Sequence, residues 1–151
     1  MKSARITAPN APLSVSESET PKPEGDQVLV KVGSVGVCHS DLHLWEGGYD
    51  LGDGQFMKVT DRGVKYPVTP GHEIVGKVIE IGSQVSKFKV GELIGVGVFV
   101  DSCRNCSSCL AGLEQYCLEG MTGTYNALER DGKTVAYGGY CDKFVIDEDY
   151  A

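Results

Sequence analysis

The sequence of 151 residues lacks any apolar run long enough to span a membrane. A membrane helix needs about 20 consecutive apolar residues, whereas the longest uncharged apolar run, residues 93–100, is bounded by Glu92 and Asp101. The amino-terminal segment MKSARITAPN is basic but has no apolar stretch behind it, so it is not a secretory signal. We therefore expect a cytoplasmic protein without a membrane partner.

Clusters of basic residues are also missing. The chain has 14 Lys and Arg against 21 Asp and Glu, which gives a net charge of −7. Because phosphate contacts require grouped Lys and Arg, this balance argues against nucleic acid as a partner. Disulfides are not expected either, since a reducing cytosol keeps thiols free and a chain of this length buries a core without them. The six cysteines are therefore expected to include metal ligands.

Glycine is abundant, with 20 of 151 positions and no repeat period, and we interpret these glycines as turns and bulges. Several segments alternate apolar and polar residues, as half-buried strands do. Val28, Val30 and Val32 share one face of such a segment, and Ile79 shares a face with Ile81. The pattern predicts six strands, near residues 3–8, 13–19, 27–37, 73–82, 92–100 and 139–147.

Helix is predicted at one place only. Ser40 is expected to be the N-cap of a helix of one or two turns that ends at Glu46, before Gly47 and Gly48. Residues 48–70 are expected to form a long polar loop. With no internal repeat or boundary, the chain is predicted to be one mainly β domain, a barrel or distorted sandwich with few exposed strand edges.

Four of the six cysteines lie within fifteen residues, with the spacing C-x2-C-x2-C-x7-C: Cys103, Cys106, Cys109 and Cys117. Four thiolates make a closed tetrahedral site, which is typical of structural zinc. The first three cysteines also match the start of a bacterial iron–sulfur pattern, but there the fourth follows after three residues and precedes Pro. Here the gap is seven residues and Leu118 follows. Zinc is favoured, and an iron–sulfur cluster or unligated thiols are the alternatives.

A second group of possible ligands is formed by CHSDLH at residues 38–43 and GHE at residues 71–73. Each half alone is a weak signal, because a single Cys or His is usually a packed or surface residue. Together they supply a thiolate, imidazoles and carboxylates at strand ends. Catalytic zinc uses three protein ligands and keeps one position open. We therefore expect side chains of these two segments to converge on one metal ion.

The segment GHEIVGKVIEIGSQV, residues 71–85, fits the signature G-H-E-x2-G-x5-G-x2-V at every fixed place. GVCHSDLH, residues 36–43, and the spacing of the four cysteines match the same family. The sequence thus resembles the zinc-containing medium-chain alcohol dehydrogenases, whose catalytic domain is a GroES-like β-barrel with a four-cysteine zinc lobe. Residues 124–149 are similar to the cinnamyl alcohol dehydrogenase branch.

The resemblance implies one catalytic and one structural zinc ion, with NAD or NADP as the cofactor. It implies Cys38 and His72 as catalytic zinc ligands, Glu73 as a carboxylate beside the metal and Asp41 as the residue that holds the His72 ring. The substrate would be a small alcohol or aldehyde, and zinc would lower the pKa of the alcohol before hydride transfer to the nicotinamide.

The same resemblance implies how protons and substrate are handled. Ser40 would accept the proton of the substrate hydroxyl and begin a relay that ends at His43 near solvent. His39 would lie near the cofactor pyrophosphate. Trp45 would line the alcohol pocket.

Two departures from the family matter. Its third catalytic ligand, a Cys, would fall roughly fifteen residues beyond Ala151, and the glycine fingerprint of a Rossmann domain is absent. We therefore expect residues 1–151 to be the amino-terminal portion of the catalytic domain, inactive alone and a homo-oligomer at full length. Cys141 is an alternative ligand, although its place in a predicted strand favours a buried thiol.

The alternative function is a stand-alone zinc-binding β-barrel with a structural or interaction role. The four cysteines would serve either function. Only an alcohol dehydrogenase, which interconverts alcohols and aldehydes or ketones, gives a reason for Cys38 and His72 to accompany Ser40 and His43.

Overall fold

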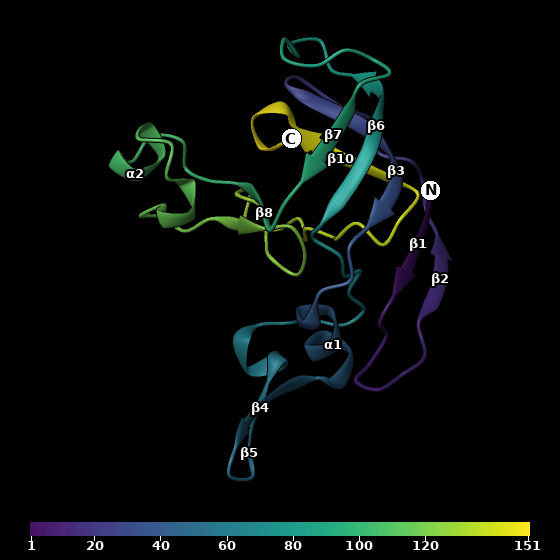
Figure 1. Cartoon of the computed structure of the whole chain (residues 1–151), viewed down its shortest axis with the longest axis vertical. Coiled ribbons are helices and arrows are strands. Elements are labelled where there is room, and N and C mark those ends of the chain that lie inside the picture. The colour runs from purple at the N-terminus through teal and green to yellow at the C-terminus, as the bar shows by residue number, and fades with distance from the viewer.

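The computed structural model describes residues 1–151 and consists mainly of short strands (Figure 1). The largest sheet has four antiparallel strands in the order β10-β3-β6-β7. Their bounds are Lys143–Asp147 for β10, Gln27–Val35 for β3, Ile74–Ile81 for β6 and Leu93–Val96 for β7. The predicted mainly β fold is confirmed.

The amino-terminal hairpin joins this sheet through single bridges and not through a continuous ladder. It consists of β1 (Lys2–Arg5) and β2 (Ser14–Glu17), which pair with each other. Isolated bridges link Ser3 to Cys141 and Ile6 to Val68. The hairpin is therefore attached to the segments that precede β10 and β6.

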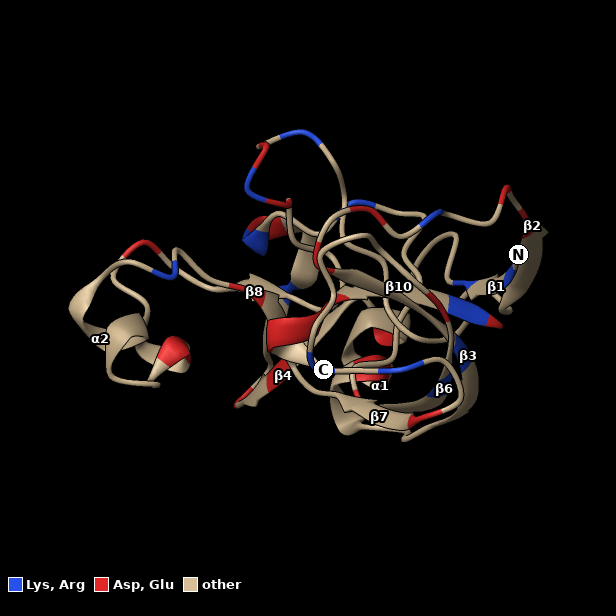
Figure 2. Ribbon diagram, turned by 90° about the horizontal axis from the view of Figure 1, so that it is seen from above, with Lys and Arg blue, Asp and Glu red and all other residues tan.

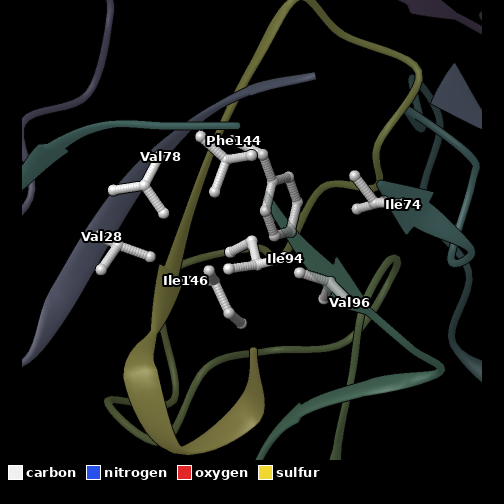
Figure 3. Packing of buried hydrophobic residues seen from close by; sticks show 8 residues of the cluster. Val28, Ile74, Val78, Ile94, Val96, Phe144 and Ile146 are labelled. Atoms are coloured by element: carbon white, nitrogen blue, oxygen red, sulfur yellow. The ribbon is translucent and has the colours of Figure 1, made fainter. Parts of the chain in front are cut away.

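The core is formed by side chains from all four strands of the largest sheet (Figure 3). In the central strand β3, Val28, Leu29 and Val30 are all buried, because neighbours cover both sides of the strand. Eight buried apolar side chains form the main cluster: Val28, Val30, Ile74, Val78, Ile94, Val96, Phe144 and Ile146.

The buried face of β6 is the one that carries Ile74 and Val78. Ile79 and Ile81 share a face, as predicted, but that face is the exposed one, with 36% and 39% of their surfaces accessible. The alternation of apolar and polar residues could not predict which face of β6 is buried, because β6 has apolar residues on both faces.

The predicted strand at 92–100 is divided in two. After β7 the chain turns at Gly97 and resumes as β8 (Phe99–Asp101), which pairs with the two-residue strand β9 (Thr122–Gly123). The last strand, β10, begins at residue 143 and not near 139, because the backbone bonds of residues 139–142 are divided among β1, β3 and the segment before β6 and form no continuous ladder.

Helix α1 (His39–Glu46) was predicted, but its N-cap is Cys38 and not Ser40. The carboxylate of Asp41, at the third helical position, accepts the N–H of Cys38 at 2.9 Å, which fixes the start of the helix two residues earlier than a cap at Ser40 would. The helix ends at Gly47, whose φ of 86° and N–H bond to the His43 carbonyl form the expected glycine stop.

The prediction of a long polar loop at 48–70 was wrong. Strands β4 (Gly48–Gly52) and β5 (Gln55–Lys58) form a protruding hairpin, followed by the 3₁₀ helix η1 (Val59–Arg62) (Figure 1). The turn is Asp53-Gly54, with φ of 51° and 75°. An Asp-Gly pair with two positive φ angles is a preferred hairpin turn, so the sequence contained the signal.

The four cysteines lie in residues 101–120, here called the lobe, between β8 and β9. The lobe contains the short helix α2 (Ser107–Leu110) and the 3₁₀ turn η2 (Glu114–Tyr116). Seen from above (Figure 2), it projects to one side of the sheet, and α2 carries no charged side chain. A last 3₁₀ turn, η3 (Glu148–Tyr150), follows β10. None of the helices is long and apolar enough to cross a membrane.

Candidate functional site

The four lobe cysteines converge on one point. The ligand atoms of Cys103, Cys106, Cys109 and Cys117 all lie within 4.8 Å of one another. The sulfur of Cys109 lies 3.8 Å from that of Cys103 and 3.5 Å from that of Cys106. Four sulfurs held tetrahedrally at about 2.3 Å from zinc would be about 3.8 Å apart, so this donor set fits a zinc ion.

Backbone N–H groups favour the thiolate form, which a metal needs, at Cys106 and Cys117. At Cys103 the backbone bond from Asn105 acts in the same direction, but burial and the bonds to the Cys117 and Cys106 thiols outweigh it and raise the pKa to about 11. The N–H of Leu118 donates to the Cys106 sulfur at 3.5 Å and is the main cause that lowers the pKa of Cys106 to about 6. The N–H of Cys103 donates to the Cys117 sulfur at 3.4 Å and is the main cause that lowers the pKa of Cys117. Arg130 adds a cation 3.7 Å from the Cys117 sulfur.

A second group of ligand atoms lies at one edge of the main sheet. The thiol of Cys38, the imidazole of His72 and the carboxylate of Glu73 lie within 4.8 Å of one another. Antiparallel strands β3 and β6 bring them together, because the pairing of Val35 with Ile74 places the end of β3 beside the start of β6. The predicted convergence of Cys38 and His72 is confirmed. Thiolate, imidazole and carboxylate are all donors that zinc accepts.

The remaining thiol is separate from both groups. Cys141 belongs to neither set of converging ligands. Its thiol donates to the carbonyl of Lys143 at 2.9 Å, and burial raises its pKa to about 11. These features match a packed neutral thiol and not a metal ligand.

Asp41 ties the two ligand-bearing segments to each other. Its buried carboxylate accepts the N–H of Cys38 at 2.9 Å, the N–H of Gly71 at 3.0 Å and the hydroxyl of Tyr140 at 3.2 Å. Gly71 has a φ of +95°, which favours glycine. The resemblance implied a bond from Asp41 to the ring of His72. In this structure Asp41 instead fixes the backbone before that ring.

Ser40 lies in the first turn of α1, and its hydroxyl has one protein partner, the hydroxyl of Tyr125 at 2.9 Å. A cavity of about 180 Å³ adjoins it, with Tyr49, Arg62 and Tyr125 in its walls. Burial is the main cause that raises the pKa of Tyr125 to about 12. A wider groove of about 640 Å³ runs past His72 and Glu73. The site is therefore open to small molecules.

The two other histidines of the chain, His39 and His43, both belong to α1, and their rings are stacked on each other. His43 packs between His39 and Tyr49, with ring centroids 4.6 and 4.3 Å apart. Its Nδ1 atom is buried and has no hydrogen-bond partner, and the nearest carboxylate oxygen, of Glu46, is 3.9 Å away. His39 is exposed at the first position of the helix. The Nδ1 atom of His43 therefore has an unused hydrogen-bonding capacity inside the protein.

Trp45 is not among the residues that line the cavity beside Ser40. Its indole N–H donates to the carbonyl of Ala11 at 2.8 Å, and 37% of its surface is exposed. This contact packs the end of α1 against the loop between β1 and β2. The structure gives no support to the expected place of Trp45 in the alcohol pocket.

Two site residues were missed from the sequence, Tyr125 and Tyr140. Their partners Ser40 and Asp41 are 85 and 99 residues away, so no local spacing pointed to them. The similarity of residues 124–149 to one enzyme branch was the single available signal.

The chain was compared with known proteins. The sequence model of the family described as "Alcohol dehydrogenase GroES-like domain" matches residues 24–151. The NADP-dependent alcohol dehydrogenase C 1 of Mycolicibacterium smegmatis is 52% identical over 124 residues, which make up 82% of this chain and 32% of that protein. The "Probable cinnamyl alcohol dehydrogenase 6" of Arabidopsis thaliana is 47% identical over 126 residues, 83% of this chain and 31% of that protein.

A similar solved structure is the crystal structure of CAD from Helicobacter pylori complexed with NADP(H). It matches with a TM-score of 0.81 and 32% identity, over 99% of this chain and 40% of that one. The chain thus spans about a third of the length of the curated relatives it matches.

Proposed function

Because the chain belongs to the alcohol dehydrogenase family through its GroES-like domain, we propose that it forms the catalytic portion of a zinc- and NADP-dependent alcohol dehydrogenase. The observation that carries the proposal is the convergence of Cys38, His72 and Glu73 within 4.8 Å, with Ser40 two residues after the thiol. A stand-alone zinc-binding barrel would give no reason for this second group, since the four lobe cysteines already make a closed site.

The proposal assigns one zinc ion to each group of ligands. The four lobe cysteines would hold a structural ion. Cys38 and His72 would hold a catalytic ion, with the Glu73 carboxylate beside it and a further Cys ligand from outside these residues. When bound, a zinc ion supplies Lewis acidity that lowers the pKa of an alcohol hydroxyl, and the oxidised nicotinamide accepts the hydride.

The residues of α1 would handle the proton that leaves the alcohol. Ser40 can accept this proton on its oxygen and give up its own, so the hydroxyl is regenerated in each turnover. His43 would receive the proton at the buried, unpartnered Nδ1 and release the proton of its other ring nitrogen, Nε2, to solvent. His39, exposed at the start of the helix, would lie near the cofactor pyrophosphate.

NADP is the proposed cofactor because a relative 52% identical to the chain is named for NADP. The nucleotide-binding Rossmann domain would lie outside residues 1–151, which contain no G-x-G-x-x-G fingerprint. We propose that the full-length protein is a homo-oligomer located in the cytoplasm, as expected from its composition.

Primary aromatic or allylic alcohols, and the matching aldehydes, are the proposed substrates. This choice depends on residues 124–149, which are similar to the cinnamyl alcohol dehydrogenase branch, and on a relative named for cinnamyl alcohol. Tyr49 and Tyr125 supply aromatic walls to the cavity beside Ser40, which suits a flat substrate.

The test is the rate of NADP reduction, followed by absorbance, with cinnamyl alcohol and ethanol. We expect turnover by protein that carries these residues together with a nucleotide-binding domain, a higher kcat/KM for cinnamyl alcohol, and no turnover by residues 1–151 alone. A zinc-loaded protein with its nucleotide domain that is inert toward every alcohol would contradict the proposal and favour the binding module.

A further inference from the structure

Tyr125 connects the two halves of the proposed site. Its hydroxyl donates a hydrogen bond of 2.9 Å to the Oγ of Ser40, in the first turn of α1. Its ring is stacked on the imidazole of His72, with centroids 5.2 Å apart and an angle of 5° between the planes. One side chain therefore contacts both the hydroxyl proposed to take the proton and a proposed metal ligand.

The backbone on both sides of Tyr125 is held by hydrogen bonds to two neighbouring segments. The N–H of Thr124 donates to the carbonyl of Val98 at 3.2 Å, and the N–H of Asn126 donates to the carbonyl of Ala136 at 2.9 Å. The side chain of Tyr125 is itself half-buried. The backbone of Tyr125 is therefore fixed, and its hydroxyl has few alternative positions relative to Ser40.

A serine hydroxyl has one proton to donate and two lone pairs to accept with. When the phenol of Tyr125 occupies one lone pair of Ser40, the other lone pair and the Ser40 proton remain for transfer. We propose that Tyr125 is a positioning residue, which fixes the orientation of the Ser40 hydroxyl so that it accepts the alcohol proton and passes its own proton on. This inference rests on the proposed function of Ser40; the proton of Tyr125 is not transferred.

Tyr66 offers a matched comparison. Its hydroxyl also donates to α1, to the carbonyl of Leu44 at 2.5 Å, but that carbonyl belongs to the helix backbone and has no part in the proposed proton transfer. Replacement of Tyr125 or Tyr66 by Phe removes one hydrogen bond to the same helix. Only the Tyr125 bond ends on the reactive hydroxyl.

The experiment has two readouts. Three-bond NMR couplings of residues 1–151 report the rotamer of Ser40, and steady-state rates of the protein with its nucleotide domain report kcat and KM. For Tyr125→Phe we expect the Ser40 couplings to change from those of a single rotamer to an average over several. We expect kcat to fall about tenfold, with KM and zinc content unchanged. In a Ser40→Ala background, Tyr125→Phe should cause no further fall in kcat. Tyr66→Phe should leave the Ser40 rotamer and kcat unchanged.

The inference is overturned if Tyr125→Phe leaves the Ser40 rotamer unchanged, or if its loss of kcat is as large in the Ser40→Ala background. Should the wild-type protein oxidise no alcohol, the proposed function fails, and the couplings alone decide whether Tyr125 orients Ser40. A rotamer lost in Tyr125→Phe and kept in Tyr66→Phe supports the positioning role. Equal couplings in all three proteins refute it.

Discussion

Ser40 is the residue on which the proposed proton transfer depends. Its oxygen has one protein partner, Tyr125, which leaves an acceptor position for the alcohol. Ser40→Ala should lower kcat by at least about 10², the usual cost of a lost proton-transfer group, and leave the zinc content unchanged. Absorbance of reduced NADP and metal analysis measure both quantities. Ser83→Ala, at an exposed loop position, is the control and should keep full activity. Equal kcat values in the two variants would remove Ser40 from the reaction.

Asp41 holds the two ligand segments in place without being a ligand itself. Asp41→Asn keeps the shape of the side chain but replaces one acceptor oxygen with an amide that faces the N–H of Cys38 or Gly71. We expect the free energy of unfolding to fall by about 2 kcal/mol. Zinc should also bind more weakly at Cys38 and His72. Denaturant titration and competition with a chelator measure the two effects.

The control for this change is Asp61→Asn, at an exposed position of η1. Its stability and zinc affinity should equal those of the wild type. If Asp41→Asn were as stable as this control, the Asp41 carboxylate would not hold the Cys38 and His72 segments together.

Among the elements, the lobe is joined to the end of the chain by several contacts of one arginine. Arg104 pairs with Asp101 at 3.0 Å, with Asp147 at the end of β10 at 2.8 Å and with Asp149 in η3 at 3.2 Å. It also lies over the ring of Tyr150, 5.1 Å from its centroid. These carboxylates raise the pKa of the Arg104 guanidinium, against the effect of its partial burial. Arg104 therefore remains charged, and its side chain bridges the lobe and the end of the chain.

Arg104→Met should loosen the lobe while the barrel stays intact. Partly exposed ion pairs contribute about 0.2–1 kcal/mol each, so backbone amides of residues 101–120 should exchange with solvent roughly fivefold faster. Amides of β3 and β6 should keep their wild-type rates. Hydrogen exchange with mass spectrometry measures both regions. Lys133→Met, which removes an exposed cation without an ion pair, is the control. Unchanged exchange in the lobe would show that Arg104 is not its anchor.

The interiors of the central strands were predictable because their alternation is local. β3 and β6 lie within the predicted ranges. The errors occur where pairing decides the outcome: β7 and β8 are separated at Gly97, and Gly48–Lys58 form a hairpin that depends on an Asp-Gly turn. Which face of β6 is buried also depends on neighbours that its own sequence does not contain.

The metal ligands were predictable for a related reason. The four lobe cysteines are close in sequence, and Cys38 and His72 follow a family pattern whose segments adjoin neighbouring strands. Tyr125 was not predictable, since its contacts to Ser40 and His72 depend on how a distant loop packs. The pocket role that the family implies for Trp45 stays a prediction, and the structure shows its indole N–H bound to the carbonyl of Ala11.

In the whole molecule the two groups of ligands lie on separate parts of the fold. The lobe projects from the sheet beyond β8 (Figure 1), whereas Cys38 lies at the start of α1 and His72 lies just before β6. Neither group shares a residue with the other. A metal ion at one site is therefore not required to form the other, and the two sites can be removed one at a time.

Zinc content per chain, measured by native mass spectrometry on the protein with its nucleotide-binding domain, tests the central claim most directly. The wild type should hold two zinc ions. Cys109→Ser should lose the lobe ion and keep the other, and Cys38→Ser should lose the catalytic ion and keep the lobe ion, so each variant should hold one. A wild type with a single ion that Cys38→Ser retains and Cys109→Ser loses would contradict the account and leave a zinc-binding barrel without a catalytic metal.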